Sequence, residues 1–260
     1  MRIAAYQMQI AWENKEENFR RLEKKLREAS EKQVDLLLLP EMSFTGFSMN
    51  TELTKEANQE TVEKVKSLAA AYGMAIGFGW VLDCGEKCEN HYTVVSQYGE
   101  ILSDYAKIHP FSYSGEDEKF VGGEKLSAFR LQGIPFSTFI CYDLRFPELF
   151  QCVSQNAHIL LVPANWPAKR SHHWKSLLQA RAIENQAYLI GINCVGMTGK
   201  LYYSGDSCMI SPDGEILQEL HDEEGLLVYD LTDDVESYRA AFPVKKDRRT
   251  ELYQTFWKDA

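Results

Sequence analysis

Three side chains that could together hydrolyse a substrate stand where extended segments end: Glu41, Lys107 and Cys141. A thiol can attack a carbonyl carbon, a buried carboxylate can take its proton, and an ammonium can hold the thiolate and the later oxyanion. Cys141 ends the segment 135–141 shortly before Pro147 opens a predicted helix, and a helix start favours negative charge. These residue types together suit a cysteine hydrolase.

Other interpretations of these residues stay open at this level. An unpaired cysteine most often behaves as a small buried hydrophobic residue, and Glu41 and Lys107 could form a buried ion pair beside it. A Cys–His pair is harder to build, because the best-placed histidine is His109, which follows Lys107 closely. From residue types alone, the trio is one possible catalytic set among several.

The remaining cysteines and histidines do not indicate a metal site or a disulfide framework. The chain has six cysteines: Cys84, Cys88, Cys141, Cys152, Cys194 and Cys208. Cys84 and Cys88 are the nearest pair, but no second pair and no matching histidine pair follows, and His172-His173 is more typical of a polar helix start. We therefore expect reduced thiols, no metal and no cofactor.

Composition and charge exclude several classes of partner. A net charge of −10 argues against a nucleic acid or an anionic membrane as partner. No apolar run approaches the roughly 18 to 20 residues of a membrane span, and the N-terminus lacks the apolar core of a secretion signal. We expect a cytoplasmic protein with a small-molecule substrate. Nothing in the middle of the chain resembles a linker, so residues 1–260 are predicted to form a single domain.

Apolar runs and helical spacings alternate along the chain. The runs 34–41 and 159–166 are typical of strands covered on both faces, and hairpin signals lie at 97–100 and 211–214. The expected strands cover residues 2–9, 34–41, 74–81, 91–96, 101–107, 126–131, 135–141, 159–166, 188–195, 207–210, 215–217 and 226–230. The expected helices cover 14–29, 59–72, 147–156 and 171–186.

Two polar segments, 82–90 and 112–118, are expected to be loops, and the second could fold over a site. Strands alternate with helices in each half of the chain, yet each half also contains a hairpin. That combination predicts an α/β protein with two mixed sheets and helices on their outer faces.

Three sequence blocks resemble the signature of the carbon–nitrogen hydrolase (nitrilase) superfamily, in the same order. They are Leu-Leu-Leu-Leu-Pro-Glu41-Met, Tyr-Ala-Lys107-Ile-His and Ile-Cys141-Tyr-Asp-Leu-Arg-Phe-Pro-Glu. Further similar blocks cover 162–167, 179–185, 203–207, 242–244 and 247–249, so the resemblance spans nearly the whole chain. It implies a four-layer α-β-β-α sandwich of two mixed β-sheets flanked by helices, with a catalytic Glu41–Lys107–Cys141 triad.

The same resemblance implies roles for neighbouring residues. A second catalytic glutamate is expected in the loop after Lys107, where Glu116 is the best match and Glu118 the alternative. The oxyanion is expected to bind the Lys107 ammonium and the backbone N–H of Tyr142.

Two further residues are candidates for binding substrate. Arg145 could pair with a substrate carboxylate or form a structural ion pair at the turn, and Trp166 could wall the pocket or pack in the core. Asp143 is not included in the predicted site.

Within the superfamily, the short chain, the Cys-Tyr-Asp-Leu-Arg-Phe-Pro block and the Ala-Asn-Trp-Pro turn are most similar to the omega-amidase branch. That branch deamidates 2-oxoglutaramate and 2-oxosuccinamate, which implies cleavage of a small amide to an acid and ammonia through a thioester. N-carbamoyl amide hydrolases and deaminated-glutathione amidases share the triad and remain alternatives. The resemblance also implies a homodimer or a higher homo-oligomer paired through outer helices. A non-catalytic scaffold is a hypothesis of another class, which the complete trio opposes.

Overall fold

Two β-sheets form the centre of the structure, a computed structural model that describes residues 1–258. The strands of the first sheet are β1 (Arg2–Gln7), β2 (Leu36–Leu38), β3 (Ala75–Asp83), β4 (Cys88–Val95), β5 (Ile101–Ala106) and β13 (Gly225–Asp230). The strands of the second are β6 (Phe129–Leu131), β7 (Ile134–Thr138), β8 (Ile159–Ala164), β9 (Tyr188–Asn193), β10 (Val195–Thr198), β11 (Leu201–Ile210) and β12 (Ile216–His221).

Helices connect these strands and cover the sheets. The α-helices are α1 (Lys15–Glu31), α2 (Thr51–Thr54), α3 (Glu60–Tyr72), α4 (Glu116–Lys119), α5 (Pro147–Val153), α6 (Ser171–Asn185), α7 (Val235–Ala241) and α8 (Thr250–Lys258). Short 3₁₀ turns are η1 (Ser112–Ser114), η2 (Cys141–Arg145), η3 (Ala168–Arg170) and η4 (Val244–Asp247).

Both sheets mix parallel and antiparallel pairs. The first has the order β13-β1-β2-β3-β4-β5, in which β1, β2 and β3 are parallel and the other pairs antiparallel. The second has the order β10-β11-β9-β8-β7-β6, with β12 paired to β11 and with β7, β8 and β9 parallel. The prediction of two mixed sheets is therefore confirmed.

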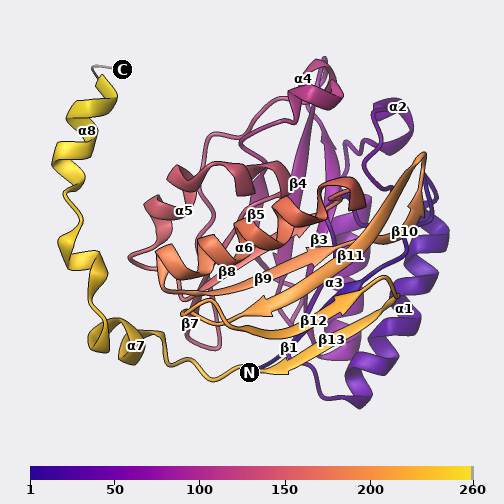
Figure 1. Ribbon diagram of the computed structural model, residues 1–260. Coiled ribbons are helices and arrows are strands. Elements are labelled where there is room, and N and C mark those ends of the chain that lie inside the picture. Colours follow the sequence, from indigo (N-terminus) through magenta and orange to yellow (C-terminus); the bar gives the residue numbers. More distant parts are fainter. Residues whose placement is uncertain (259–260) are drawn as a thin grey trace.

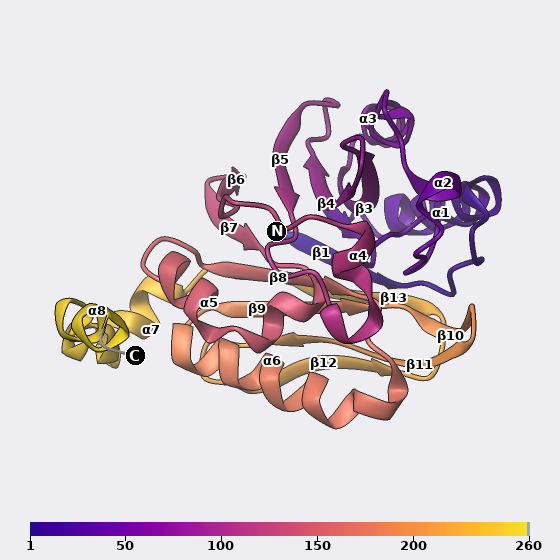
Figure 2. The same ribbon diagram turned by 90° about the horizontal axis from the view of Figure 1, so that it is seen from above.

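Alternating side chains along the central strands build three separate apolar layers. On β2, Leu36 and Leu38 pack between the two sheets, while Leu37 packs under α1 and α3. On β8, Ile159 packs between the sheets, while Leu160 packs under α5 and α6. This period-two alternation confirms the four-layer arrangement, with α1 and α3 on one outer face and α5 and α6 on the other (Figures 1 and 2).

Several predicted boundaries were wrong. Segment 82–90 is not wholly a loop, because β3 and β4 pair as far as Asp83 and Cys88, and cross-strand hydrogen bonds outweigh the polar composition there. Segment 112–118 contains η1 and the start of α4. The strand expected over 135–141 ends at Thr138, and the helix expected over 147–156 ends at Val153.

α7 packs against the body of the protein, where Val235 is buried and Arg239 Nη2 donates to the Ala157 carbonyl at 2.7 Å, and α8 lies apart from the sheets (Figure 1). The helices of residues 1–258 include none with the length and apolar character needed to cross a membrane.

Candidate active site

Three strand ends meet at one point between the sheets. Glu41 follows β2, Lys107 follows β5 and Cys141 follows β7. The first two side chains are buried, with 0% and 1% exposure, while Cys141 is partly exposed and lines a pocket together with Lys107. The packing of the two sheets thus brings together residues that lie up to one hundred positions apart in the chain.

Lys107 lies between two buried carboxylates. Its Nζ is 3.0 Å from Glu41 Oε1 and 2.8 Å from Glu116 Oε2. Glu116 is fully buried at the start of α4, whereas Glu118 is exposed, so the structure places Glu116 and not Glu118 beside the lysine. Burial acts to lower the pKa of Lys107, but the charges of Glu116 and Glu41 outweigh it and raise that pKa. Lys107 therefore remains an ammonium.

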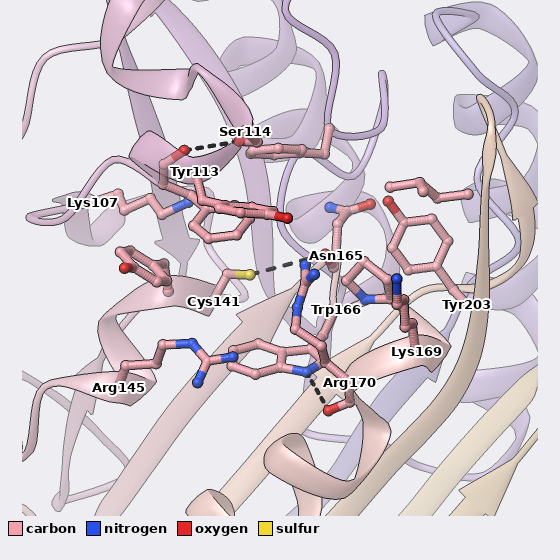
Figure 3. Close-up of a pocket in the computed structure, with 15 residues that line it drawn as sticks. Lys107, Tyr113, Ser114, Cys141, Arg145, Asn165, Trp166, Lys169, Arg170 and Tyr203 are labelled. Atoms are coloured by element: carbon pink, nitrogen blue, oxygen red, sulfur yellow. Dashed lines mark hydrogen bonds between the residues drawn. The ribbon is translucent and has the colours of Figure 1, made fainter.

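A strained turn presents Cys141 to the pocket. Cys141 has φ +47°, in the left-handed region, which costs about 1–2 kcal/mol for a residue with a Cβ. Asp143 holds this turn, because its Oδ2 accepts the N–H of Ile140 at 3.0 Å. Figure 3 shows the sulfur directed into the pocket, and such backbone strain is typical of functional sites.

The environment of Cys141 disfavours the thiolate. Burial raises the pKa of the thiol, the charge of Glu41 raises it further, and Lys107 offsets only part of this effect. The raised pKa is consistent with the expectation that a carboxylate takes the thiol proton during attack. A base must take the proton during attack, and Glu41 is the adjacent carboxylate.

Two asparagines that the sequence analysis did not select hold the glutamates in place. The backbone N–H of Asn165 donates to Glu41 Oε2 at 2.9 Å, and its Nδ2 donates to the Glu41 carbonyl at 2.6 Å. Asn90 Nδ2 donates to Glu41 Oε1 at 2.8 Å and to Glu116 Oε1 at 3.2 Å. Asn165 stands in the Ala-Asn-Trp-Pro turn, which was a usable signal, but Asn90 fell in a segment predicted to be a loop.

Asp143, which was left out of the predicted site, is a buried structural hub. Its carboxylate accepts the Tyr105 hydroxyl at 2.8 Å and the His109 backbone N–H at 3.0 Å. The His109 ring lies 2.9 Å from Asp143 through Nδ1 and stacks on Phe146 with centroids 3.7 Å apart. Among the described residues no hydrogen bond joins His109 to Cys141, so the contacts favour the glutamate rather than the histidine as base.

The sulfur opens onto a pocket of about 230 Å³, roughly the volume of eight liquid water molecules, which suits a small substrate. Its aromatic lining residues are Phe47, Phe111, Tyr113, Tyr142, Trp166 and Tyr203. Trp166 is 3% exposed, and its indole packs 5.4 Å from that of Trp174. Trp166 therefore both walls the pocket and packs in the core, and its two predicted alternatives are not exclusive.

Tyr142 and Arg145 lie where substrate could reach them. The N–H of Tyr142 belongs to the first turn of η2, where backbone N–H groups have no partner within the helix. Arg145 lines the pocket, its guanidinium 4.8 Å from the Trp166 ring centre and 3.3 Å from His173 Nδ1. Within residues 1–258 no carboxylate forms an ion pair with Arg145, which speaks against the structural ion pair.

Residues 1–258 contain no cluster of three or more acidic, histidine or cysteine side chains placed to hold a metal ion.

Comparison with known proteins identifies the family that this chain matches and several similar proteins. The family model described as carbon-nitrogen hydrolase matches residues 2–240. The chain is 34% identical over 257 residues to the 2-oxoglutaramate amidase of Bacillus subtilis, covering 96% of this chain and 98% of that protein. It is 33% identical over 218 residues to the omega-amidase YafV of Escherichia coli, covering 84% of each.

Solved structures match the fold over the same length. An amidase from Nesterenkonia sp. AN1, crystallised as a mutant with acrylamide added at its active-site cysteine, superimposes with a TM-score of 0.86 at 28% identity. The match covers 98% of this chain and 99% of that one.

Proposed function

This chain belongs to the carbon–nitrogen hydrolase family, and on that premise we propose that it is an omega-amidase. It is a hydrolase of carbon–nitrogen bonds other than peptide bonds, and the reaction proposed is conversion of the omega-amide of a 2-oxo dicarboxylic acid, such as 2-oxoglutaramate or 2-oxosuccinamate, into the acid and ammonia. The observation that carries the proposal is the buried Lys107, held between Glu41 and Glu116 beside a pocket-facing Cys141 thiol.

The first half-reaction forms a thioester. Glu41 takes the thiol proton as the Cys141 sulfur attacks the amide carbon, and the oxyanion binds the Lys107 ammonium and the Tyr142 N–H. The tetrahedral intermediate collapses, the carbon–nitrogen bond breaks, and Glu41 returns the proton to the departing nitrogen, which leaves as ammonia. The raised pKa of the thiol makes this transfer necessary.

The second half-reaction regenerates the enzyme. Glu41 takes a proton from water, the resulting hydroxide attacks the thioester carbon, and the carbon–sulfur bond breaks. The leaving thiolate takes the proton back from Glu41, and the acid departs. Glu116 keeps Lys107 charged, because its carboxylate lies 2.8 Å from the ammonium. It also orients the substrate nitrogen.

Assembly and location are further proposals. A homodimer or higher homo-oligomer, paired through outer helices, and a cytoplasmic location follow from the resemblance and the composition.

Ammonia release tests the proposal. Wild-type protein is assayed with 2-oxoglutaramate, 2-oxosuccinamate, an N-carbamoyl amino acid and an aliphatic nitrile, and the omega-amides are expected to give the highest kcat/KM. Cys141→Ala should lower turnover by about 10³-fold or more while the circular dichroism spectrum and Tm stay those of the wild type. Intact mass spectrometry should detect an acyl adduct on wild type only.

Cys152→Ala is the matched control, because Cys152 is an exposed cysteine on α5. It should retain wild-type turnover. Unchanged ammonia release from Cys141→Ala would refute the mechanism. No turnover of any substrate by the wild type would refute the enzyme activity and favour the scaffold.

A further inference from the structure

Two guanidinium groups line the pocket without an acidic partner. Arg145 comes from η2 and Arg170 from the end of η3, and their side chains reach into the pocket from different sides (Figure 3). Throughout residues 1–258, neither forms a salt bridge with any carboxylate. Other half-buried cations, such as Lys15, Arg21 and Lys175, pair with carboxylates.

Aromatic rings hold both guanidiniums in place. The Arg145 guanidinium lies 4.8 Å from the Trp166 ring centre, and that of Arg170 lies 5.3 Å from the ring centre of Phe111. The Trp166 indole N–H also donates to the Arg170 carbonyl at 2.8 Å, which ties the backbone of η3 to the pocket wall. Stacking of this kind positions a guanidinium while leaving its N–H groups free for a ligand.

The two charges act on each other across the pocket. Burial lowers the pKa of Arg145, and the positive charge of Arg170 lowers it further. Two like charges that line one pocket repel each other, and an anion bound by both would relieve the repulsion. Lys107 does not supply the same attraction, because Glu41 and Glu116 already pair with it.

We propose that Arg170 is a specificity-determining residue that, together with Arg145, binds the carboxylate of an anionic omega-amide and so selects it over neutral amides. This inference rests on the proposed function and names the recognition element of the same site. A planar guanidinium can donate two parallel hydrogen bonds to a carboxylate, and two of them on different sides of the pocket direct the amide end of the substrate toward Cys141.

The test compares two amides of the same chain length, the monoamide of glutarate and pentanamide, which differ in the terminal carboxylate. For Arg170→Gln, the ratio of kcat/KM for the monoamide to that for pentanamide should fall about 10- to 100-fold, because a charge-assisted hydrogen bond is lost. The loss should appear mainly in KM. Arg170→Lys should recover part of the ratio, since it keeps the charge but not the fork.

Lys169→Gln is the matched control, because Lys169 is exposed at the pocket rim next to Arg170. It should keep the ratio within about threefold; an equal fall would mean a general positive field and would overturn the inference. An equal loss on both substrates in Arg170→Gln, or no loss at all, would also overturn it. Failure of the proposed function is separate, because the wild type would then hydrolyse none of the omega-amides.

Discussion

At the scale of single residues, the site depends on one ammonium buried between two carboxylates. Lys107, Glu41 and Glu116 are each at most 1% exposed. Removing one member of a buried ion pair leaves an uncompensated charge without water, and here the loss of Lys107 would leave two. The same side chain that is proposed to bind the oxyanion thus also stabilises the fold.

Lys107→Met is therefore expected to abolish amide hydrolysis and to lower the free energy of unfolding by about 3–5 kcal/mol. Urea unfolding followed by circular dichroism measures the second effect, and the ammonia assay the first. Lys119→Met, an exposed lysine on α4, should change the free energy of unfolding by no more than about 0.5 kcal/mol. Wild-type stability in Lys107→Met would contradict the buried ion pairs.

At the scale of elements, the β4–β5 hairpin carries the site on one face and a charged cluster on the other. Asn90 on β4 contacts Glu41, and β5 ends just before Lys107. On the adjacent residue, His91 Nδ1 lies 2.9 Å from Asp104 Oδ1 and Nε2 lies 3.0 Å from Glu89 Oε2. The contact with Asp104 joins β4 to β5, whereas Glu89 lies on β4 itself, so the protonation of His91 affects the hairpin that positions the lysine.

This cluster predicts a pH dependence of stability. Burial acts to lower the pKa of His91, but Asp104 and Glu89 outweigh it, so the pKa is raised above 6.5. Because this pKa is raised in the folded state, protonated His91 adds to the free energy of unfolding. The addition is full below pH 6.5 and is lost as the pH rises through the folded-state pKa. The pKa of Asp104 is lowered: burial opposes this shift, but the hydrogen bond from His91 outweighs it. Ionised Asp104 therefore adds to the free energy of unfolding above pH 3.8, and this addition is lost as the pH falls through the folded-state pKa of Asp104.

His91→Gln should lower the free energy of unfolding by about 1–3 kcal/mol at pH 5.5, and the difference from wild type should shrink as the pH rises to 9. Urea titrations at several pH values measure it. His172→Gln, an exposed histidine on α6, should follow the wild type throughout. A difference that does not vary with pH would show that His91 contributes through packing alone.

At the scale of the whole molecule, the site exists because the two sheets meet closely. Gln7 of β1 is buried, and its Oε1 accepts the N–H of Ser207 on β11 at 2.9 Å. Gly205 on β11 has φ +70°, and a Cβ there would lie 2.1 Å from the Gln7 side chain. This close approach fixes the spacing of the sheets near the pocket, where neighbouring Tyr203 is a lining residue.

Gly205→Ala should therefore destabilise the protein more than backbone strain alone would. A positive φ costs about 1–2 kcal/mol for alanine, and displacement of Gln7 adds about 1–3 kcal/mol of overpacking. Gly73→Ala is the control, because Gly73 has φ +61° with open space around it and carries only the strain. Equal losses in free energy of unfolding for the two variants would show that the sheets adjust freely.

Local patterns in the sequence were enough to predict the central strands, the family and the activity. The continuous apolar runs 34–41 and 159–166 predicted strands covered on both faces, and the strands observed there do pack apolar side chains on both faces. The three signature blocks identified the family, the fold and an amide-hydrolysing activity, which the comparisons confirm. These features depend on residue types at short spacings, which a sequence displays directly.

Only the tertiary structure decided which side chains touch. Burial beside Lys107 distinguished Glu116 from Glu118, and sheet pairing placed Asn90 against both glutamates although its segment was predicted to be a loop. The pKa of the Cys141 thiol is raised because burial and Glu41 outweigh Lys107, a balance of distances that no linear pattern contains. Arg170 and Arg145 line one pocket only because the fold brings η2 and η3 to its border. Such contacts join residues distant in the chain, so their energies depend on packing and desolvation that exist only in the folded state.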